Sequence, residues 1–115
     1  MEQYEKRAIH EDLCDQMHEL YCKKNTDYGD SFAQMRQRYP NVIGMKLWEK
    51  VNRLCTLLDS GKQEVLDESI EDTLMDIANY AIMELTERKV DQASRLDTVG
   101  AVSAVYEQTT IKEDN

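Results

Sequence analysis

Apolar residues recur every three or four positions along most of the chain, the spacing that buries one face of a helix. The first run predicts a helix over residues 2–24, with an apolar face of Ile9, Leu13, Met17, Leu20 and Tyr21. The second predicts a helix over 42–59, with the stripe Leu47, Trp48, Val51, Leu54, Cys55 and Leu58. The third predicts a helix from about 63 or 64 to 89, with an inward face of Leu66, Ile70, Leu74, Ile77, Ala81 and Leu85. The pattern therefore predicts an all-α fold.

Turn-forming residues mark the breaks between these helices. Residues 25–31 are rich in Asn, Asp and Gly, so we expect a loop there, followed by a short helix that Ser31 caps and that ends near Arg38. Pro40, the only proline, marks the next break. Only a few residues around Gly61 separate the second and third helices. We therefore expect these two long helices to pack as an antiparallel hairpin.

The helical pattern weakens after Val90. We accordingly predict one helical domain over residues 1–90 and a C-terminal extension over 91–115, whose structure the sequence leaves open, with residues 93–97 able to continue as helix. A chain of 115 residues is long enough for one domain with its own core.

Composition and charge narrow the classes of function. The formal net charge of −9 argues against a nucleic-acid partner, because binding the phosphate backbone needs a basic surface. No apolar run approaches the roughly 18 residues that span a membrane, and residues 1–7 lack the apolar core of a signal peptide, so we expect a cytoplasmic protein with no membrane partner. The three cysteines include no C-x-x-C pair and predict neither a disulfide framework nor a zinc ribbon. His10 and His18 are interpreted as surface or core-edge residues.

An acidic row is the strongest chemical feature. Glu68, Asp72 and Asp76 follow one another at intervals of four, with Asn79 on the same helix face. The repulsion in such a row is relieved by a divalent cation or by facing Lys and Arg side chains. The alternative for the first members is a solvated face near a helix start. Asp76, at the edge of the apolar stripe, is partly desolvated and needs a partner.

The hairpin can bring part of the second helix opposite this row. Glu49 and Asn52 would then face Asp72 and Asp76, and oxygen ligands from two helices suit Mg²⁺. Lys50 and Arg53 would stabilise the charge of a polyphosphate. The alternative is an ordinary salt-bridged helix face.

The predicted loop is the other candidate element. Tyr28 can stack on a base, and Asp30 can bond a base edge or a sugar hydroxyl. The alternative is a capping turn with Tyr28 packed on the core. On the third helix, Asn79 is interpreted as a ligand contact and Tyr80 as structural.

Three strings of residues together resemble a known family. They are KNTDYGDSF at 24–32, WEKVNRL at 48–54 and EDTLMDIANYA at 71–81. They resemble the small MazG-like proteins of phages and bacteria called nucleotide-modification-associated domains, over roughly residues 5–88. The resemblance implies a MazG-like helical bundle with two long antiparallel central helices, completed as a homodimer or homotetramer. It also implies a nucleotide ligand and a cytoplasmic setting, in the host cell if the protein is phage-encoded.

The implied activity is Mg²⁺-dependent (or Mn²⁺-dependent) hydrolysis of a deoxy or modified nucleoside triphosphate to monophosphate and pyrophosphate. The implied catalytic residues are Glu49, Asp72 and Asp76. The metal ligands are Glu49, Asn52, Glu68, Asp72 and Asp76, and the substrate contacts are Tyr28, Asp30, Lys50, Arg53 and Asn79.

Two positions depart from the family pattern. Asn52 stands where an E-x-x-E pair has its second Glu, and Thr73 stands where an E-x-x-D pair has its Glu. These departures favour one alternative, a sequestering or regulatory nucleotide-binding protein of phage type without hydrolysis. A further alternative is a purely structural helical interaction protein, in which the acidic row is a solvated face or docks on a basic partner.

Overall fold

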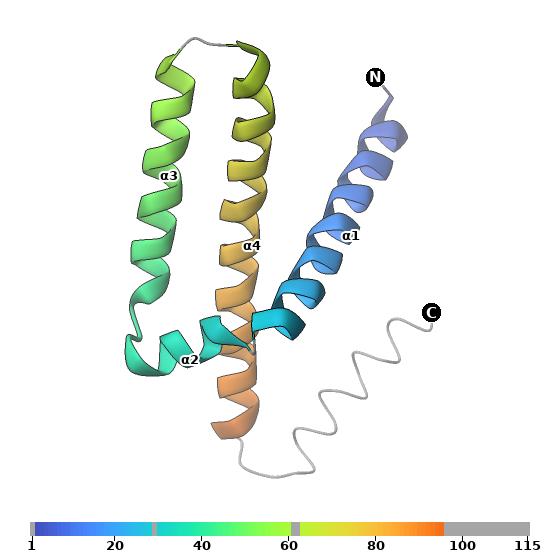
Figure 1. Ribbon diagram of the computed structural model, residues 1–115. Helices are drawn as coiled ribbons and strands as arrows, with labels where there is room; N and C mark the ends of the chain where they lie inside the picture. Colours follow the sequence, from blue (N-terminus) through green and yellow to red (C-terminus); the bar gives the residue numbers. More distant parts are fainter. Residues whose placement is uncertain (1, 29, 61–62, 96–115) are drawn as a thin grey trace. The chain divides into compact units, whose positions relative to one another are not determined.

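The computed structural model describes residues 2–28, 30–60 and 63–95, without the side chains of 27–28 and 63–67. All secondary structure in this part of the chain is helical, which confirms the predicted all-α class (Figure 1). The elements are α1 (Gln3–Tyr28), α2 (Ser31–Arg38), α3 (Val42–Ser60) and α4 (Gln63–Arg95). The chain divides into two compact units, Met1–Ala81 and Ile82–Asn115. The predicted domain boundary after residue 90 stays a prediction.

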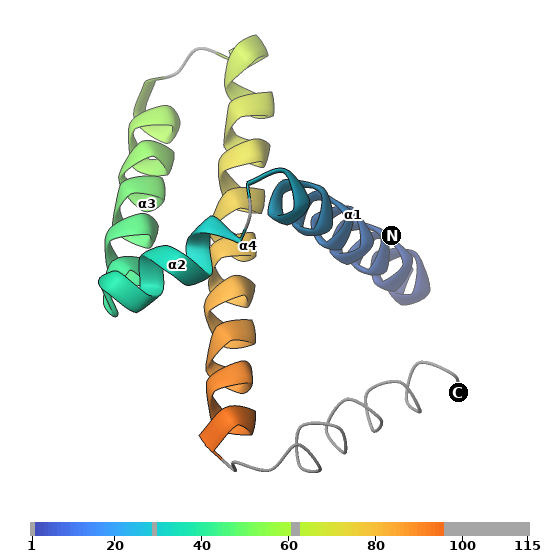
Figure 2. The same cartoon turned by 60° about the horizontal axis from the view of Figure 1, so that its bottom comes forward.

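The predicted hairpin is present in the first unit. Helix α3 and the first part of α4 run antiparallel, side by side, in both Figure 1 and Figure 2. An ion pair joins them, with Lys50 Nζ on α3 3.1 Å from Asp76 Oδ2 on α4. Because the connection between the two helices is short, they lie next to each other and run antiparallel, as expected.

Helix α1 is longer than predicted, and the loop expected over residues 25–31 is largely absent. Residues 25–28 are helical. The Thr26 hydroxyl donates to the Cys22 carbonyl at 2.9 Å, and the Asp30 N–H donates to the Asn25 carbonyl at 3.3 Å. These bonds satisfy polar groups within the last turns of the helix, so the turn-forming composition does not end it earlier.

Asp30 joins α1 to α2 in the left-handed conformation, with φ 60° and ψ 42°. Asp tolerates this region better than most residues do. Asp30 occupies the N-cap position of α2 and makes no side-chain cap bond. The prediction that Ser31 caps this helix is therefore wrong, because Ser31 is already its first residue.

The predicted break at Pro40 is confirmed. The Val42 N–H donates to the Tyr39 carbonyl at 2.9 Å, which closes a turn with Pro40 and Asn41 at its centre. Proline suits the second position of such a turn because its φ is already fixed near the required value. The chain therefore changes direction sharply between α2 and α3 (Figures 1 and 2).

The most buried of the described α4 side chains is Thr73, one position before Leu74 of the predicted inward face. Thr73 is 2% exposed and its hydroxyl donates to the Ser69 carbonyl at 2.7 Å, whereas Leu74 is 48% exposed. Ile70, Ile77 and Ala81 are half-buried. The inward placement predicted for Leu74 is wrong, as is that of Leu85, which is 53% exposed in the second unit. The inner face of α4 is therefore partly polar.

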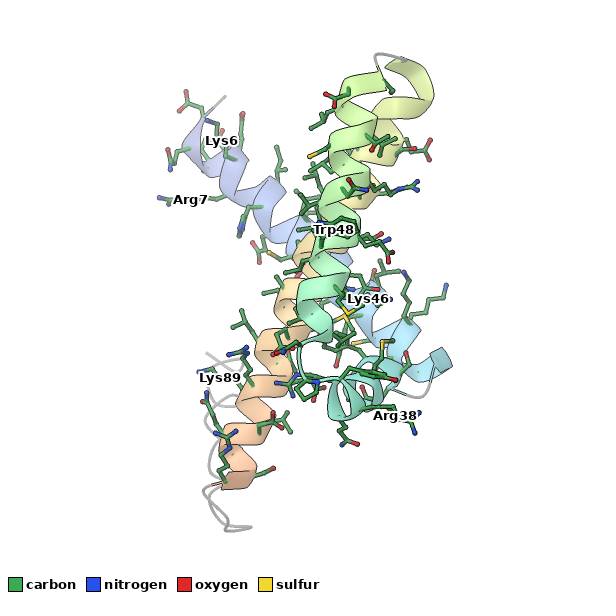
Figure 3. The ribbon with its side chains drawn as sticks, turned by 90° about the vertical axis from the view of Figure 1, so that its left-hand side faces the viewer. Lys6, Arg7, Arg38, Lys46, Trp48 and Lys89 are labelled. Atoms are coloured by element: carbon green, nitrogen blue, oxygen red, sulfur yellow. The ribbon has the colours of Figure 1, made fainter. Side chains whose placement is uncertain are left out.

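Helix α3 also leaves apolar residues outside the hairpin. Leu47 and Leu54 are half-buried, but Trp48, Val51 and Leu58 are 70%, 45% and 59% exposed. Figure 3 views the molecule from the α3 side and shows Trp48 on the face turned away from α4. The apolar stripe predicted for this helix therefore divides between a face that packs on α4 and a face that the described residues leave uncovered.

Two hydrophobic residues, Phe32 and Val42, are buried in the described part of the chain. The Phe32 ring packs on Tyr80, with ring centroids 6.1 Å apart and the planes tilted by 54°. This contact fixes α2 on α4 and agrees with the structural role predicted for Tyr80.

Helix α4 continues to Arg95, beyond its predicted end at residue 89. The rest of the predicted extension, residues 96–115, lies outside the described residues. Among the helices that the structure describes, none is both long and apolar enough to cross a membrane.

Candidate functional site

The Lys50–Asp76 ion pair is the centre of the candidate site. The side chains are 23% and 32% exposed, so both charges are partly removed from water. The prediction that Asp76 needs a partner is confirmed, and the partner is Lys50. An oppositely charged neighbour at this distance offsets much of the cost of partial burial for each group.

The acidic row on α4, defined as Glu68, Asp72 and Asp76, presents its members differently. Glu68 and Asp72 are exposed, and Asp76 is half-buried against α3. Asn79, one turn further along, is also half-buried. The row therefore leads from solvent toward the hairpin interface, and its last carboxylate is neutralised by a cation.

A basic row on α3, defined as Lys46, Lys50 and Arg53, runs beside that interface. Members four and three residues apart lie on one side of a helix. Lys46 and Lys50 are half-buried and Arg53 is exposed; Figure 3 labels Lys46 on α3. Three cations in one row are a suitable surface for the oxygens of a phosphate chain.

The structure does not gather the predicted metal ligands into one group. Glu49 and Asn52 are both exposed on α3, and the described contact to Asp76 comes from Lys50. Among the described residues, no three or more His, Cys, Asp or Glu side chains are placed to hold a metal ion. The described residues of one chain thus do not fit a complete Mg²⁺ site, and the ligand set stays a prediction.

Thr73 occupies the position where the family resemblance has a carboxylate. Its hydroxyl is buried and engaged by the Ser69 carbonyl, so it contributes to packing inside α4. Sequence reasoning noted the departure from the motif but missed the burial. A small polar residue one position before an apolar one gave no signal of which would face inward.

The candidate nucleoside contacts around Asp30 are only partly described. The Tyr28 side chain lies outside the described residues, and Asp30 is exposed at the junction of α1 and α2. Base stacking by Tyr28 and hydrogen bonding by Asp30 stay predictions.

One comparison with known proteins identifies a family. The sequence profile described as nucleotide modification associated domain 1 matches residues 24–87, a segment that contains α2, α3 and the acidic row. No curated protein and no solved structure matches the chain. The match covers more than half of the sequence and includes both partners of the central ion pair. The chain therefore belongs to the family of nucleotide modification associated domain 1.

Proposed function

We propose that the protein binds a nucleoside triphosphate, with a deoxy or modified nucleoside, at the α3–α4 hairpin, and that it hydrolyses this nucleotide to monophosphate and pyrophosphate in the presence of Mg²⁺. The family description supports association with nucleotides. The resemblance to MazG-like pyrophosphohydrolases supports the reaction. The observation that carries the site is the half-buried ion pair between Lys50 and Asp76.

An ion pair of this kind suits a polyphosphate ligand. Lys50 and Asp76 satisfy each other in the free chain, with 3.1 Å between Nζ and Oδ2. A bound Mg²⁺–triphosphate would offer a cation to Asp76 and a phosphate oxygen to Lys50, so neither half-buried charge would lose its partner. Arg53, three residues after Lys50, is exposed and would bind the more distal phosphates.

A second candidate function is nucleotide binding without hydrolysis, as in a sequestering or regulatory protein. Two observations favour it. Thr73 is buried with its hydroxyl bonded, and the described residues contain no group of three or more acidic, His or Cys side chains suited to a metal ion. In this function the basic row still binds phosphates, and Asp76 holds Lys50 in position.

We also propose that the chain assembles as a homodimer or homotetramer. Among the described hydrophobic residues of one chain only Phe32 and Val42 are buried, at 5% and 6% exposure, which is too little for a stable core. Trp48 and Leu58 on α3 and Leu74 on α4 are each about half exposed or more. A second copy that covers these faces would complete the bundle.

One experiment separates the two functions. The protein is incubated with a panel of natural and modified nucleoside triphosphates, with and without Mg²⁺, and both thermal shift and pyrophosphate release are followed. Hydrolysis predicts Mg²⁺-dependent release that Asp76→Asn abolishes and that Asp59→Asn, an exposed carboxylate at the end of α3, retains. A thermal shift without release would establish the second candidate.

A variant of the basic row tests the binding step that both functions share. Lys50→Met should weaken nucleotide affinity by about 10- to 100-fold, because it removes a charge-assisted hydrogen bond to phosphate. Lys6→Met, on the exposed first turns of α1, is the matched control and should leave affinity unchanged. If no nucleotide raises the melting temperature, both functions are refuted and a structural interaction protein remains.

A further inference from the structure

Helix α1 carries a row of alternating histidines and cysteines that the proposed nucleotide site does not use. His10, Cys14, His18 and Cys22 follow one another at intervals of four residues. Side chains four apart are neighbours on one side of a helix. All four are exposed.

The side chains pair within this row. Cys14 Sγ lies 3.9 Å from His10 Nδ1, and Cys22 Sγ lies 3.6 Å from His18 Nε2. Each pair belongs to a single continuous helix, so its geometry depends on no other element. Considered separately, the histidines and the cysteines predicted no site. The signal for one is that the two residue types alternate at intervals of four.

These separations match the edge of a metal coordination tetrahedron. Bonds of about 2.3 Å to sulfur and about 2.0–2.1 Å to nitrogen, at tetrahedral angles around Zn²⁺, place neighbouring S and N atoms about 3.5–3.6 Å apart. The Cys22–His18 separation of 3.6 Å equals this edge, and the Cys14–His10 separation of 3.9 Å exceeds it by little. A small rotation about the side-chain bonds would bring the Cys14–His10 pair to the same spacing.

The thiols are available for such a role. Cys14 and Cys22 are free, and eight residues of helix separate them by about 12 Å, too far for a disulfide between them. The net charge of −9 also raises the local concentration of cations around the protein. Thiolate and imidazole together select Zn²⁺ and related late first-row metals over Mg²⁺, which prefers oxygen ligands.

We infer that α1 binds Zn²⁺ through two chelating pairs, His10–Cys14 and His18–Cys22. Each pair supplies two adjacent corners of a tetrahedron. The described part of the chain assembles no group of three or more metal-ligating side chains. Solvent fills the other positions. Binding displaces the thiol proton, so the sulfur coordinates as a thiolate.

The inference is tested on the full, reduced chain with Zn²⁺ or Co²⁺ as the probe, without nucleotide or Mg²⁺. Equilibrium dialysis should find about two Zn²⁺ ions per chain, one for each pair. Co²⁺ should give a sulfur-to-cobalt charge-transfer band in the near ultraviolet. Replacing one pair, as in His18→Ala with Cys22→Ser, should remove about one ion and roughly half of the band.

Cys55→Ser is the matched control, because Cys55 is exposed on α3 and outside the row. It should retain both ions and the full band. His18→Ala alone should weaken the affinity of its pair at least about tenfold, because one-point attachment lacks the gain of a second tethered ligand. Circular dichroism confirms that each variant remains helical.

Three results would overturn the inference. They are the absence of a sulfur-to-cobalt band in the reduced wild-type protein, a band that disappears in Cys55→Ser instead, and an affinity that His18→Ala leaves unchanged. The last result would identify a loose thiol contact in place of a His–Cys chelate.

Discussion

Thr73 occupies a motif position of the family that the chain resembles, and the same position is buried in the packing of α4. The resemblance places a carboxylate at this position, but the side chain there is 2% exposed and its hydroxyl is bonded to the Ser69 carbonyl. A carboxylate in the same place would lose its hydration without gaining an equivalent partner. Restoring the family motif at this residue should therefore damage the fold.

The substitution Thr73→Glu should lower the free energy of unfolding by about 3 kcal/mol or more. Urea denaturation followed by circular dichroism measures this change. Thr73→Val, which keeps the shape and removes only the hydroxyl, should cost about 1 kcal/mol. A Thr73→Glu protein as stable as the wild type would show that position 73 is not buried in solution.

At the residue scale, the sequence predicted that Asp76 needs a partner but did not identify it. A carboxylate at the edge of an apolar stripe is partly desolvated whatever faces it. The identity of the partner depends on how far α3 is rotated about its axis, and Lys50 takes the position expected for Glu49 or Asn52. Periodicity shows which residues share a face of a helix. It does not decide which of two faces packs against the neighbouring helix when both contain apolar residues.

At the scale of single elements, Phe32 fixes the short helix α2 on α4. Its side chain is 5% exposed and its ring packs on Tyr80. A helix of 8 residues is too short to be stable alone, so this contact holds it. Phe32→Ala should lower the free energy of unfolding by about 3–5 kcal/mol in a denaturant titration.

Tyr39→Ala is the control for this variant, because Tyr39 is a neighbouring aromatic residue that is 59% exposed. Its cost should stay within about 0.5 kcal/mol. Equal costs for the two variants would contradict the buried position of Phe32.

Gly44 lies in the first turn of α3 with unused space around it. Its N–H donates to the Asn41 carbonyl at 3.1 Å, and an added Cβ would meet none of the described atoms within 4 Å. Gly44→Ala should raise the free energy of unfolding by about 0.5–1 kcal/mol, because alanine loses less backbone entropy in a helix.

Denaturation at matched protein concentrations measures the effect, with Ala78→Gly, on an exposed site of α4, as the reverse control. That variant should lose about 1 kcal/mol. A Gly44→Ala protein that is less stable than the wild type would mean that another surface covers Gly44.

The boundaries of the elements were predictable where one strong signal decided them. Pro40 and the apolar period placed α3 to within a residue of its observed end. The end of α1 was not predictable from composition, because Thr26 and Asp30 form hydrogen bonds that keep residues 25–28 helical. The same residue types favour a loop or a helix end according to whether such bonds form.

At the scale of the whole molecule, the main question is what covers the outer face of α3. Trp48 is 70% exposed and faces away from α4. If this face forms the interface between copies, Trp48→Glu should weaken assembly by about 30-fold or more, as expected for a central tryptophan of an interface. Light scattering coupled to size-exclusion chromatography should find an oligomer for the wild type and a smaller species for the variant.

Tyr39→Glu, which introduces the same charge at another exposed aromatic residue, should leave the assembly unchanged. A monomeric wild type at high concentration would refute the proposed oligomer. The oligomer was expected only from the family resemblance, because the interface between copies depends on surfaces that periodicity alone does not orient.

The exposure of Trp48 also makes the protein a reporter of its own contacts. Trp48 is the only tryptophan of the chain, so all intrinsic indole fluorescence comes from the outer face of α3. A solvated indole emits at longer wavelength and is open to collisional quenchers such as iodide, and burial reverses both properties. Emission colour and quenching, read without any label, therefore distinguish a ligand that binds inside the hairpin from a surface that docks on its outside.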